Sequence, residues 1–367
     1  MKNYKLLTPG PLTTTLTVKE EMLFDHCTWD DDYKQITQKI RSELLELAHV
    51  NSDDYTVVLM QGSGTFGVEA VITSTVGKNE KILIVANGAY GDRMVDMVTH
   101  AGIQYVKYDE PSNVSPSATK IARILDEDSR ITHVAMVHSE TTSGILNDIE
   151  SAAKVVKERN KIFIVDAMSS FGGVDIEVGT LGIDFIISSA NKCIQGVPGF
   201  SFIIANKEQL IASKGKARSL SLDIYDQWQE MEKDGKWRYT SPTHVVLAFS
   251  KAIDELKQEG GIPVRAKRYH DNNRLLIEKM EELKIYSYVD KELQGPIITT
   301  FYYPENMKFA FFDMYNYIKE RGYAIYPGKL TNADTFRIGN IGEIYQEDIE
   351  ILSDLIKDFL EEVKNNA

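Results

Sequence analysis

The sequence predicts an α/β fold with a large, mostly parallel sheet and a smaller α/β domain after it. Short apolar runs rich in β-branched residues alternate with helical patterns, as in parallel strands joined by right-handed crossovers. Small residues and glycines follow several of these runs, at the sheet edge where α/β proteins bind ligands. The 367 residues also exceed what one compact core usually holds.

Composition excludes several classes of function. The net charge is −13 without a long basic run, which argues against nucleic acid as the main partner. No apolar run approaches the length that spans a membrane, and the first residues lack the apolar core of a secretory signal. Cys27 and Cys193 are too few for a disulfide framework or a cysteine-based metal site. We therefore expect a cytoplasmic protein with no membrane partner.

The chain begins with an arm and a helix. Residues 1–15 contain LLTPGPL, which predicts a rigid extended arm rather than a helix or strand, with leucines that pack on another part of the protein. Residues 22–33 contain a histidine, a cysteine and the run Asp30, Asp31 and Asp32, which invites a metal interpretation. No second His/Cys group stands at ligand spacing, so we expect no metal there and instead a helix over about 33–50 with aspartate at its start.

The first strand–turn–helix unit has the features of a phosphate site. A strand at Thr56–Met60 runs into GSGT and then into an apolar-periodic helix. Glycines at such a turn expose backbone N–H groups at a helix N-terminus, which bind phosphate. No Lys-Ser/Thr follows, so this is not a Walker motif. A tight turn without a ligand is the simpler interpretation of Ser63, Gly64 and Thr65 taken alone.

The next units place polar and aromatic residues at the same edge. A strand from Lys81 ends in NGAYG, where Tyr90 either packs in the loop or stacks on a flat ligand. Another strand is expected over 103–108. The strand that follows residue 130 ends in HSETT, where hydroxyls such as that of Thr141 either bind a ligand or cap the turn before a helix near Asp148. The two roles are compatible.

Two further strands end in an acid and an amine. The strand Ile162–Val165 ends at Asp166, and the strand at 185–187 is followed by small residues and Lys192. If both strands are parallel members of one sheet, the two side chains emerge at one edge. A buried carboxylate and a lysine in one cavity suit pyridoxal phosphate: the lysine forms the Schiff base and the aspartate keeps the ring nitrogen protonated. A surface lysine and a turn-capping aspartate are the alternatives.

The last part of the chain has the sequence pattern of a second, smaller α/β domain. A strand that returns along the sheet is expected at 200–205, and residues 223–243 are mixed and polar. Arg337, beside Gly339 and Asn340, either binds an anionic substrate group or forms a surface salt bridge. We divide the chain into an arm at 1–15, a large domain at 16–258 and a small domain at 259–367. The other expected elements are helices at 244–259, 263–284, 308–321 and 346–364 and strands at 285–289, 297–302 and 335–338.

Seven motifs together resemble one enzyme family. These are LTPGP, GSGT, NGAYG, HSETTSG, VDAMSSFGG, SSANKCIQGVPG and FRIGNIG. Over essentially its full length the chain resembles fold-type I pyridoxal-phosphate enzymes, in the branch of the alanine–glyoxylate and serine–pyruvate aminotransferases. The resemblance implies Lys192 and Asp166 as catalytic residues. Both would also bind the cofactor, together with Ser63, Gly64, Thr65, Tyr90 and Thr141. The resemblance further implies a homodimer with a shared active site, in which Thr240 of the neighbouring subunit binds the cofactor as well. Arg337 would bind substrate.

The motif DHCTWDDDY, with Cys27 and Trp29, narrows the resemblance further. Within the branch it favours the members that transfer an amino group from 2-aminoethylphosphonate to pyruvate. An alanine– or serine–glyoxylate (pyruvate) aminotransferase is the alternative, so the substrates are an aminoalkylphosphonate or amino acid and a 2-oxo acid. A cysteine desulfurase is disfavoured because no cysteine follows Cys193. A non-catalytic regulator is disfavoured because no residues remain for a DNA-binding module.

Overall fold

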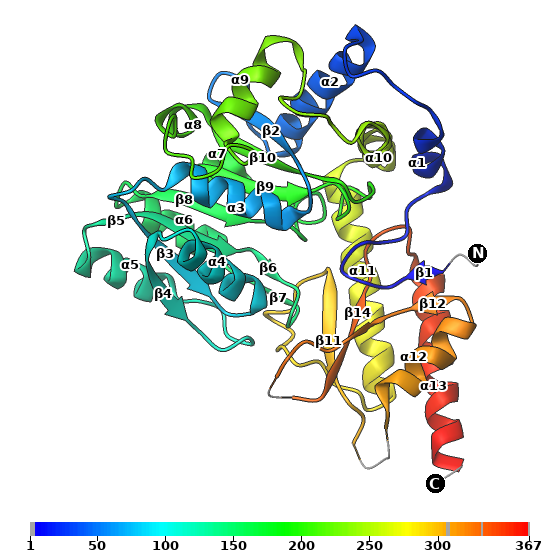
Figure 1. The fold of residues 1–367 in the computed structure, drawn as a ribbon. Helices are drawn as coiled ribbons and strands as arrows, with labels where there is room; N and C mark the ends of the chain where they lie inside the picture. The colour runs from blue at the N-terminus through cyan, green and yellow to red at the C-terminus, as the bar shows by residue number, and fades with distance from the viewer. Residues whose placement is uncertain (1–3, 306–308, 332, 366–367) are drawn as a thin grey trace.

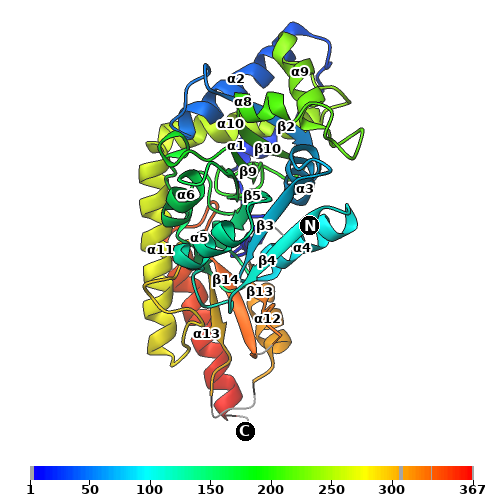
Figure 2. The ribbon, with the colours of Figure 1, turned by 90° about the vertical axis from the view of Figure 1, so that its left-hand side faces the viewer.

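The computed structural model describes residues 4–305, 309–331 and 333–365. A seven-stranded sheet with its helices forms the larger part of the molecule, and a three-stranded sheet with three helices lies beside it (Figure 1). The long helix α11 (Ile262–Glu282) runs along the smaller part (Figure 2). No described helix has both the length and the apolar character needed to cross a membrane. The proposed domain boundaries at residues 15 and 258 stay a prediction.

The large sheet is mixed but mostly parallel. Its strand order is β2-β10-β9-β8-β5-β3-β4, and only β10 runs antiparallel to its neighbours. This confirms the predicted fold class and the predicted return strand after Pro198-Gly199. The strands are β2 (Tyr55–Gln61), β3 (Lys81–Ala86), β4 (Gln104–Asp109), β5 (Ile131–Val137), β8 (Ile162–Asp166), β9 (Phe185–Ser189) and β10 (Phe200–Asn206).

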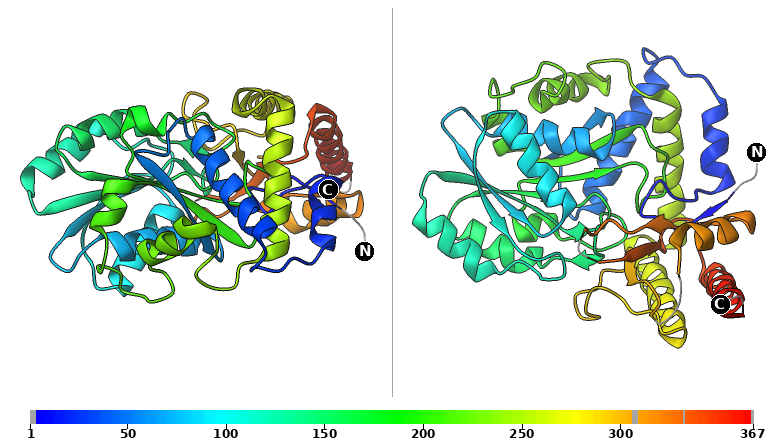
Figure 3. Two further views of the ribbon diagram at one scale, coloured as in Figure 1. Left: turned by 90° about the horizontal axis from the view of Figure 1, so that it is seen from above. Right: turned by 60° about the horizontal axis from the view of Figure 1, so that its bottom comes forward.

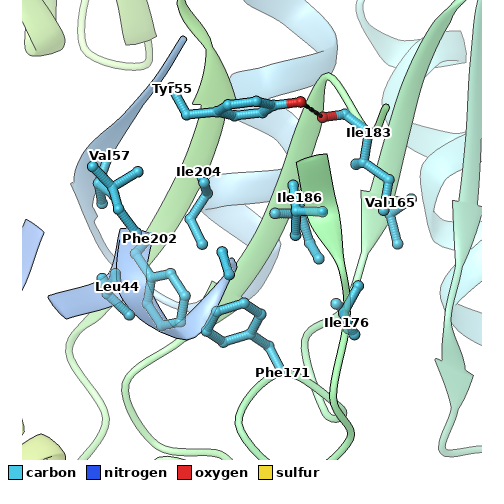
Figure 4. Close-up of a cluster of buried hydrophobic side chains, with 14 of the residues drawn as sticks. Leu44, Tyr55, Val57, Val165, Phe171, Ile176, Ile183, Ile186, Phe202 and Ile204 are labelled. Atoms are coloured by element: carbon cyan, nitrogen blue, oxygen red, sulfur yellow. Dashed lines mark hydrogen bonds between the residues drawn. The ribbon is translucent and has the colours of Figure 1, made fainter. Parts of the chain in front are cut away.

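Helices cover both faces of this sheet (Figure 3), because its central strands are apolar on both faces. Along the central strand β5, Val134 and Met136 belong to one buried cluster, and Ala135 and Val137 to a second. Figure 4 shows part of the first cluster, in which the buried Tyr55 hydroxyl donates to the carbonyl of Ile183 at 3.1 Å. The helices are α2 (Asp31–Leu47), α3 (Gly64–Thr75), α4 (Ala89–His100), α5 (Ala118–Glu127), α6 (Ile149–Lys157), α7 (Val178–Leu181), α8 (Lys207–Ala212), α9 (Ile224–Asp234) and α10 (Thr243–Glu259).

The smaller part has a core of its own. Its antiparallel sheet has the order β11-β14-β13, and helices α11, α12 and α13 pack against it around buried residues such as Phe301, Phe336 and Leu352. Two further two-residue pairs are β6 (Ser139–Glu140) with β7 (Ile145–Leu146), and β1 with β12. The remaining elements are β11 (Ile298–Tyr302), β12 (Tyr323–Ala324), β13 (Tyr326–Pro327), β14 (Thr335–Gly339), α12 (Phe311–Glu320) and α13 (Gln346–Asn365).

The N-terminal arm is partly a strand. The expectation of no strand is wrong for β1 (Lys5–Leu6), which pairs in parallel with β12 and lies beside it in Figure 1. The expectation that the leucines pack is confirmed, because Leu7 is fully buried in the smaller core and Leu12 is 6% exposed. A short helix, α1 (Leu16–Glu20), then leads toward the large sheet. The first three residues of the predicted arm lie outside the described residues.

Two other expectations differ from the structure. Residues 285–289 form no strand, only an isolated bridge between Ser287 and Phe301, so backbone pairing there is too short for a ladder. The stretch at 223–243, expected to be mixed and polar, contains α9. That helix buries Ile224, Trp228 and Met231, a helical spacing of apolar residues among charges. Residue 308, at the start of the helix expected over 308–321, lies outside the described residues.

Candidate active site

A small cavity lies at the carboxyl edge of the large sheet. Asp166 is the last residue of β8, and Lys192 lies three residues beyond the end of β9. Because β8 and β9 are adjacent and parallel, both side chains reach the same edge. The cavity lining includes Tyr90, Ser139, Thr141, Asp166, Met168 and Lys192. The structure therefore brings together the amine and the carboxylate that the sequence pointed to.

Asp166 is a buried carboxyl group with few hydrogen bonds. Its Oδ1 accepts the backbone N–H of Met168 at 2.9 Å. Burial raises its pKa to about 6, against the opposing effect of that hydrogen bond and of the Lys192 and Arg93 charges. The group is charged at neutral pH, and its surroundings favour a cationic hydrogen-bond donor next to it.

Lys192 is half-buried, with its amine turned toward the cavity. Burial lowers its pKa to about 8, so a substantial fraction is neutral near that pH. Its Nζ donates to the carbonyl of Pro9 at 2.7 Å, which places the N-terminal arm directly on the amine. The next residue, Gly10, has φ +110°, and a Cβ there would lie 2.8 Å from the Lys192 Nζ. The sequence predicted that this arm packs, but not that it covers the lysine.

The predicted phosphate turn lies beside the cavity. Ser63 precedes α3 as its N-cap, so the N–H groups of the first turn begin at Gly64 and Thr65. A Cβ on Gly64 would lie 2.1 Å from the Met168 Sδ, which shows how closely this turn approaches the cavity lining. The Thr65 hydroxyl accepts a hydrogen bond from Arg93 Nη1 at 3.2 Å. Arg93 adds a positive charge at the turn.

Glu140 holds the two loops that carry Tyr90 and Thr141. Its carboxylate accepts the backbone N–H of Tyr90 at 3.1 Å and that of Thr142 at 3.1 Å, and it also accepts the Thr142 hydroxyl. Burial raises its pKa. A Cβ on Gly88 would lie 2.4 Å from its Cγ, so the carboxylate fills the space beneath the Tyr90 loop. Thr142 is thus used internally, while Thr141 lines the cavity.

Arg337 is held by carbonyls rather than by an acid. Its Nε donates to Pro327 at 3.0 Å and its Nη1 to Thr141 at 3.0 Å. It is 6% exposed and forms no ion pair among the described residues, so the alternative of a surface salt bridge is wrong. Burial lowers its pKa without removing its charge. The Nη2 group of the guanidinium has no hydrogen-bond acceptor among the described residues and can therefore bind another partner.

Thr240 does not line this cavity. It is exposed, just before α10, and its carbonyl accepts a hydrogen bond from the side chain of Gln61 at the end of β2. His138, from the same polar cluster as Thr141, has its Nδ1 at 3.0 Å from the Ser170 hydroxyl, and burial lowers its pKa to about 4. It is therefore neutral and serves the packing behind the site.

The residues present fit pyridoxal phosphate. Tyr90 and Met168 give the cavity an aromatic and a thioether lining that suits a flat ring. The Ser139 hydroxyl, also in the lining, is buried without a hydrogen-bond partner among the described residues, which suits a polar ring substituent. Met168 and Ser139 were not among the site residues predicted from the sequence. Each lies two positions from a predicted site residue, Met168 from Asp166 and Ser139 from Thr141, and this proximity could have identified them.

A lysine and a carboxylate in one cavity, beside the N-terminus of a helix, are the groups that pyridoxal-phosphate chemistry requires. The family model for class-V aminotransferases matches residues 26–340. This chain belongs to the class-V aminotransferase family, and its cofactor is pyridoxal phosphate.

Individual relatives agree with this family. The chain is 57% identical over 366 residues, and over the full length of both chains, to the 2-aminoethylphosphonate–pyruvate transaminase of Lysinibacillus sphaericus (strain C3-41). It is 53% identical to the bifunctional phosphonoacetaldehyde hydrolase/aminoethylphosphonate transaminase of Clostridioides difficile (strain 630), with 98% of this chain matching 56% of that protein. Among solved structures, ureidoglycine–glyoxylate aminotransferase from Bacillus subtilis shares the fold, with a TM-score of 0.91 at 19% identity over 99% of this chain and 94% of that one.

Proposed function

We propose that this protein transfers the amino group of 2-aminoethylphosphonate to pyruvate, giving phosphonoacetaldehyde and L-alanine in phosphonate degradation. The observation that carries the chemistry is the pairing of Lys192 with Asp166 in one buried cavity next to Arg337. The full-length similarity to a transaminase of that name supports the substrate pair. The second relative joins its transaminase to a phosphonoacetaldehyde hydrolase, which fits that aldehyde as the product.

The roles of the chain's own groups follow from their surroundings. Bound pyridoxal phosphate supplies an electron sink for the carbon that carries the substrate nitrogen. Lys192, with its pKa near 8, would act as the base that moves the substrate proton through Nζ. Asp166, charged at neutral pH, would pair with the protonated ring nitrogen. The turn at Ser63, Gly64 and Thr65 would hold the cofactor phosphate through N–H groups at the N-terminus of α3.

The remaining residues orient the reactants. Tyr90 and Thr141 line the cavity, where Tyr90 would pack on the cofactor ring and Thr141 would hydrogen-bond its oxygen. Arg337 binds the anionic group of each substrate in turn through its Nη2 edge, since Nε and Nη1 are occupied by carbonyls. The arm carbonyl of Pro9 lies 2.7 Å from the Lys192 Nζ and limits the access of water to the amine.

A homodimer with a shared site completes this proposal. Thr240 is exposed and outside its own chain's cavity lining, which leaves it available to the cofactor phosphate of a second copy. Phe66, in the first turn of α3, is 50% exposed beside the phosphate turn, an apolar contact for that copy. Light scattering should give twice the 41.5 kDa chain mass. The free cysteines, one exposed and one buried, fit the proposed cytoplasmic location.

A donor screen tests the reaction. Purified protein with pyruvate and either 2-aminoethylphosphonate, L-serine or glycine should form alanine fastest from the phosphonate donor. Faster alanine formation from serine, or faster reaction of alanine with glyoxylate, would assign the alternative activity instead. Lys192→Ala should abolish turnover and the visible absorbance of the covalently bound cofactor; a variant that keeps both would refute the assigned lysine.

A further inference from the structure

We propose that Lys329 supplies a second positive charge for the phosphonate of the amino donor and thereby selects phosphonate donors over carboxylate donors. This inference rests on the proposed function and deepens it. Lys329 lies outside the sequence motifs that predicted the site.

The backbone next to Lys329 is fixed to the strand that carries Arg337. In the β13–β14 pair, Tyr326 is opposite Arg337 and Pro327 is opposite Phe336. Arg337 Nε donates to the Pro327 carbonyl, and the Gly328 N–H donates to the Thr335 carbonyl at 3.0 Å. A Cβ on Gly328 would lie 2.2 Å from that carbonyl, so the close approach needs glycine. Lys329 therefore leaves the pairing directly beside the arginine strand.

The side chain of Lys329 lies against Tyr90, a residue of the cavity lining. Its Nζ lies 4.6 Å from the centroid of the Tyr90 ring, and Tyr90 lines the cavity with Lys192 and Asp166. The Tyr90 hydroxyl is also close enough to Arg337 to act on the pKa of the guanidinium. Tyr90 is thus within electrostatic reach of both Arg337 and Lys329, so the two cations approach one part of the site.

Lys329 is free to turn from Tyr90 to a ligand. Among the described residues it forms no ion pair with a carboxylate, and its contact with the Tyr90 ring is a cation–π interaction at an exposed position. Such a contact at an exposed position is a weak restraint on a flexible four-carbon stem. An anion with two charges offers a stronger partner.

The charges of the two substrates explain why a second cation is useful. A phosphoryl group loses its second proton near pH 6, so at pH 7 or above the donor's anionic group carries close to two negative charges. The carboxylate of pyruvate carries one. Arg337 has a single free edge, which matches one charge. Lys329 supplies the other, and pyruvate does not need it.

The test compares Lys329→Met, Lys329→Arg and the matched control Lys357→Met, an exposed lysine on α13. Steady-state rates are measured with 2-aminoethylphosphonate, with β-alanine, in which a carboxylate replaces the phosphonate, and with varied pyruvate. We expect Lys329→Met to raise the KM for the phosphonate donor tenfold or more, with kcat and the KM for pyruvate within twofold of wild type. Lys329→Arg should restore most of the loss, and Lys357→Met should change nothing.

The pH dependence gives a second readout. The loss in kcat/KM caused by Lys329→Met should be larger at pH 8 than at pH 6, where the phosphonate carries less charge. The inference is overturned if the variant affects phosphonate and carboxylate donors equally, or affects neither. A wild-type enzyme that does not use 2-aminoethylphosphonate would instead overturn the proposed function. An active wild type with an unselective Lys329→Met variant overturns only the role of Lys329.

Discussion

Replacing Lys192 by methionine should stabilise the cofactor-free protein at neutral pH. Burial lowers the lysine pKa from 10.5 to about 8, so folding opposes its charge. At 1.36 kcal/mol per pKa unit, the charged lysine costs about 3 kcal/mol of folding free energy at pH 7. Methionine is apolar and similar in length, but it gives up the hydrogen bond to the Pro9 carbonyl, which is worth about 1 kcal/mol. The expected net gain is about 2 kcal/mol.

The pH dependence of this gain in stability shows whether the lysine charge causes it. Between pH 8 and 10.5 the unfolded wild-type chain binds more protons than the folded chain, so wild-type stability rises with pH over this range relative to the variant. The penalty on the charged lysine falls to about 1.4 kcal/mol at pH 9.5, and the lost hydrogen bond then offsets most of it. The two proteins should therefore be nearly equally stable at pH 9.5.

Urea unfolding followed by tryptophan fluorescence at both pH values measures the difference. Lys154→Met, at an exposed position on α6, controls for the loss of a lysine at the surface and should change stability by less than about 0.5 kcal/mol. A Lys192→Met protein no more stable than wild type at pH 7 would refute the reasoning. A gain that is the same at both pH values would show that it comes from packing instead of charge.

Three further predictions concern the surroundings of the site. In Gly64→Ala the new Cβ would displace Met168, 2.1 Å away, so cofactor affinity by absorbance titration should fall at least tenfold; unchanged affinity would detach this turn from the cofactor. Glu259→Gln removes the acid that pairs with the buried Arg265 at 2.7 Å and should cost about 3 kcal/mol in urea unfolding, against little change for exposed Glu361→Gln; equal effects would contradict this. A thiol reagent should label one cysteine in the native protein and two after unfolding, because Cys193 is buried and its pKa is raised to about 12; labelling of native Cys27→Ser would contradict it.

Local sequence patterns were enough to predict the residues at the centre of the candidate site. Asp166 and Lys192 each follow a short apolar β-branched strand, and a parallel sheet necessarily brings such ends to one edge. The GSGT turn likewise carries its proposed phosphate-binding role in four consecutive residues. These features depend on sequence neighbours and on one rule of sheet geometry, so the chain reveals them before its structure is known.

Contacts between distant segments are not visible in this way. The two-residue pairing of β1 with β12 joins residues more than 300 positions apart. Neither the sequence KL of β1 nor the sequence YA of β12 predicts this pairing. The position of β10 between β2 and β9 likewise depends on the packing of the whole sheet. By contrast, α9 had a signal, because Ile224, Trp228 and Met231 recur at helical spacing, but the charges between them obscured it.

The N-terminal arm connects the two cationic groups of the site. Its Pro9 carbonyl holds the Lys192 Nζ, and two residues earlier its Leu7 carbonyl accepts the N–H of Gly339, at the end of the strand that carries Arg337. A Cβ on Gly339 would lie 2.4 Å from the Thr8 carbonyl, so the arm and this strand are in close backbone contact. The buried Leu7 anchors the arm in the smaller core. The distance between the Lys192 amine and the Arg337 guanidinium, the groups proposed to transfer the proton and to bind the anion, is therefore set by a short, doubly anchored segment. A rigid sequence such as LTPGP suits that task.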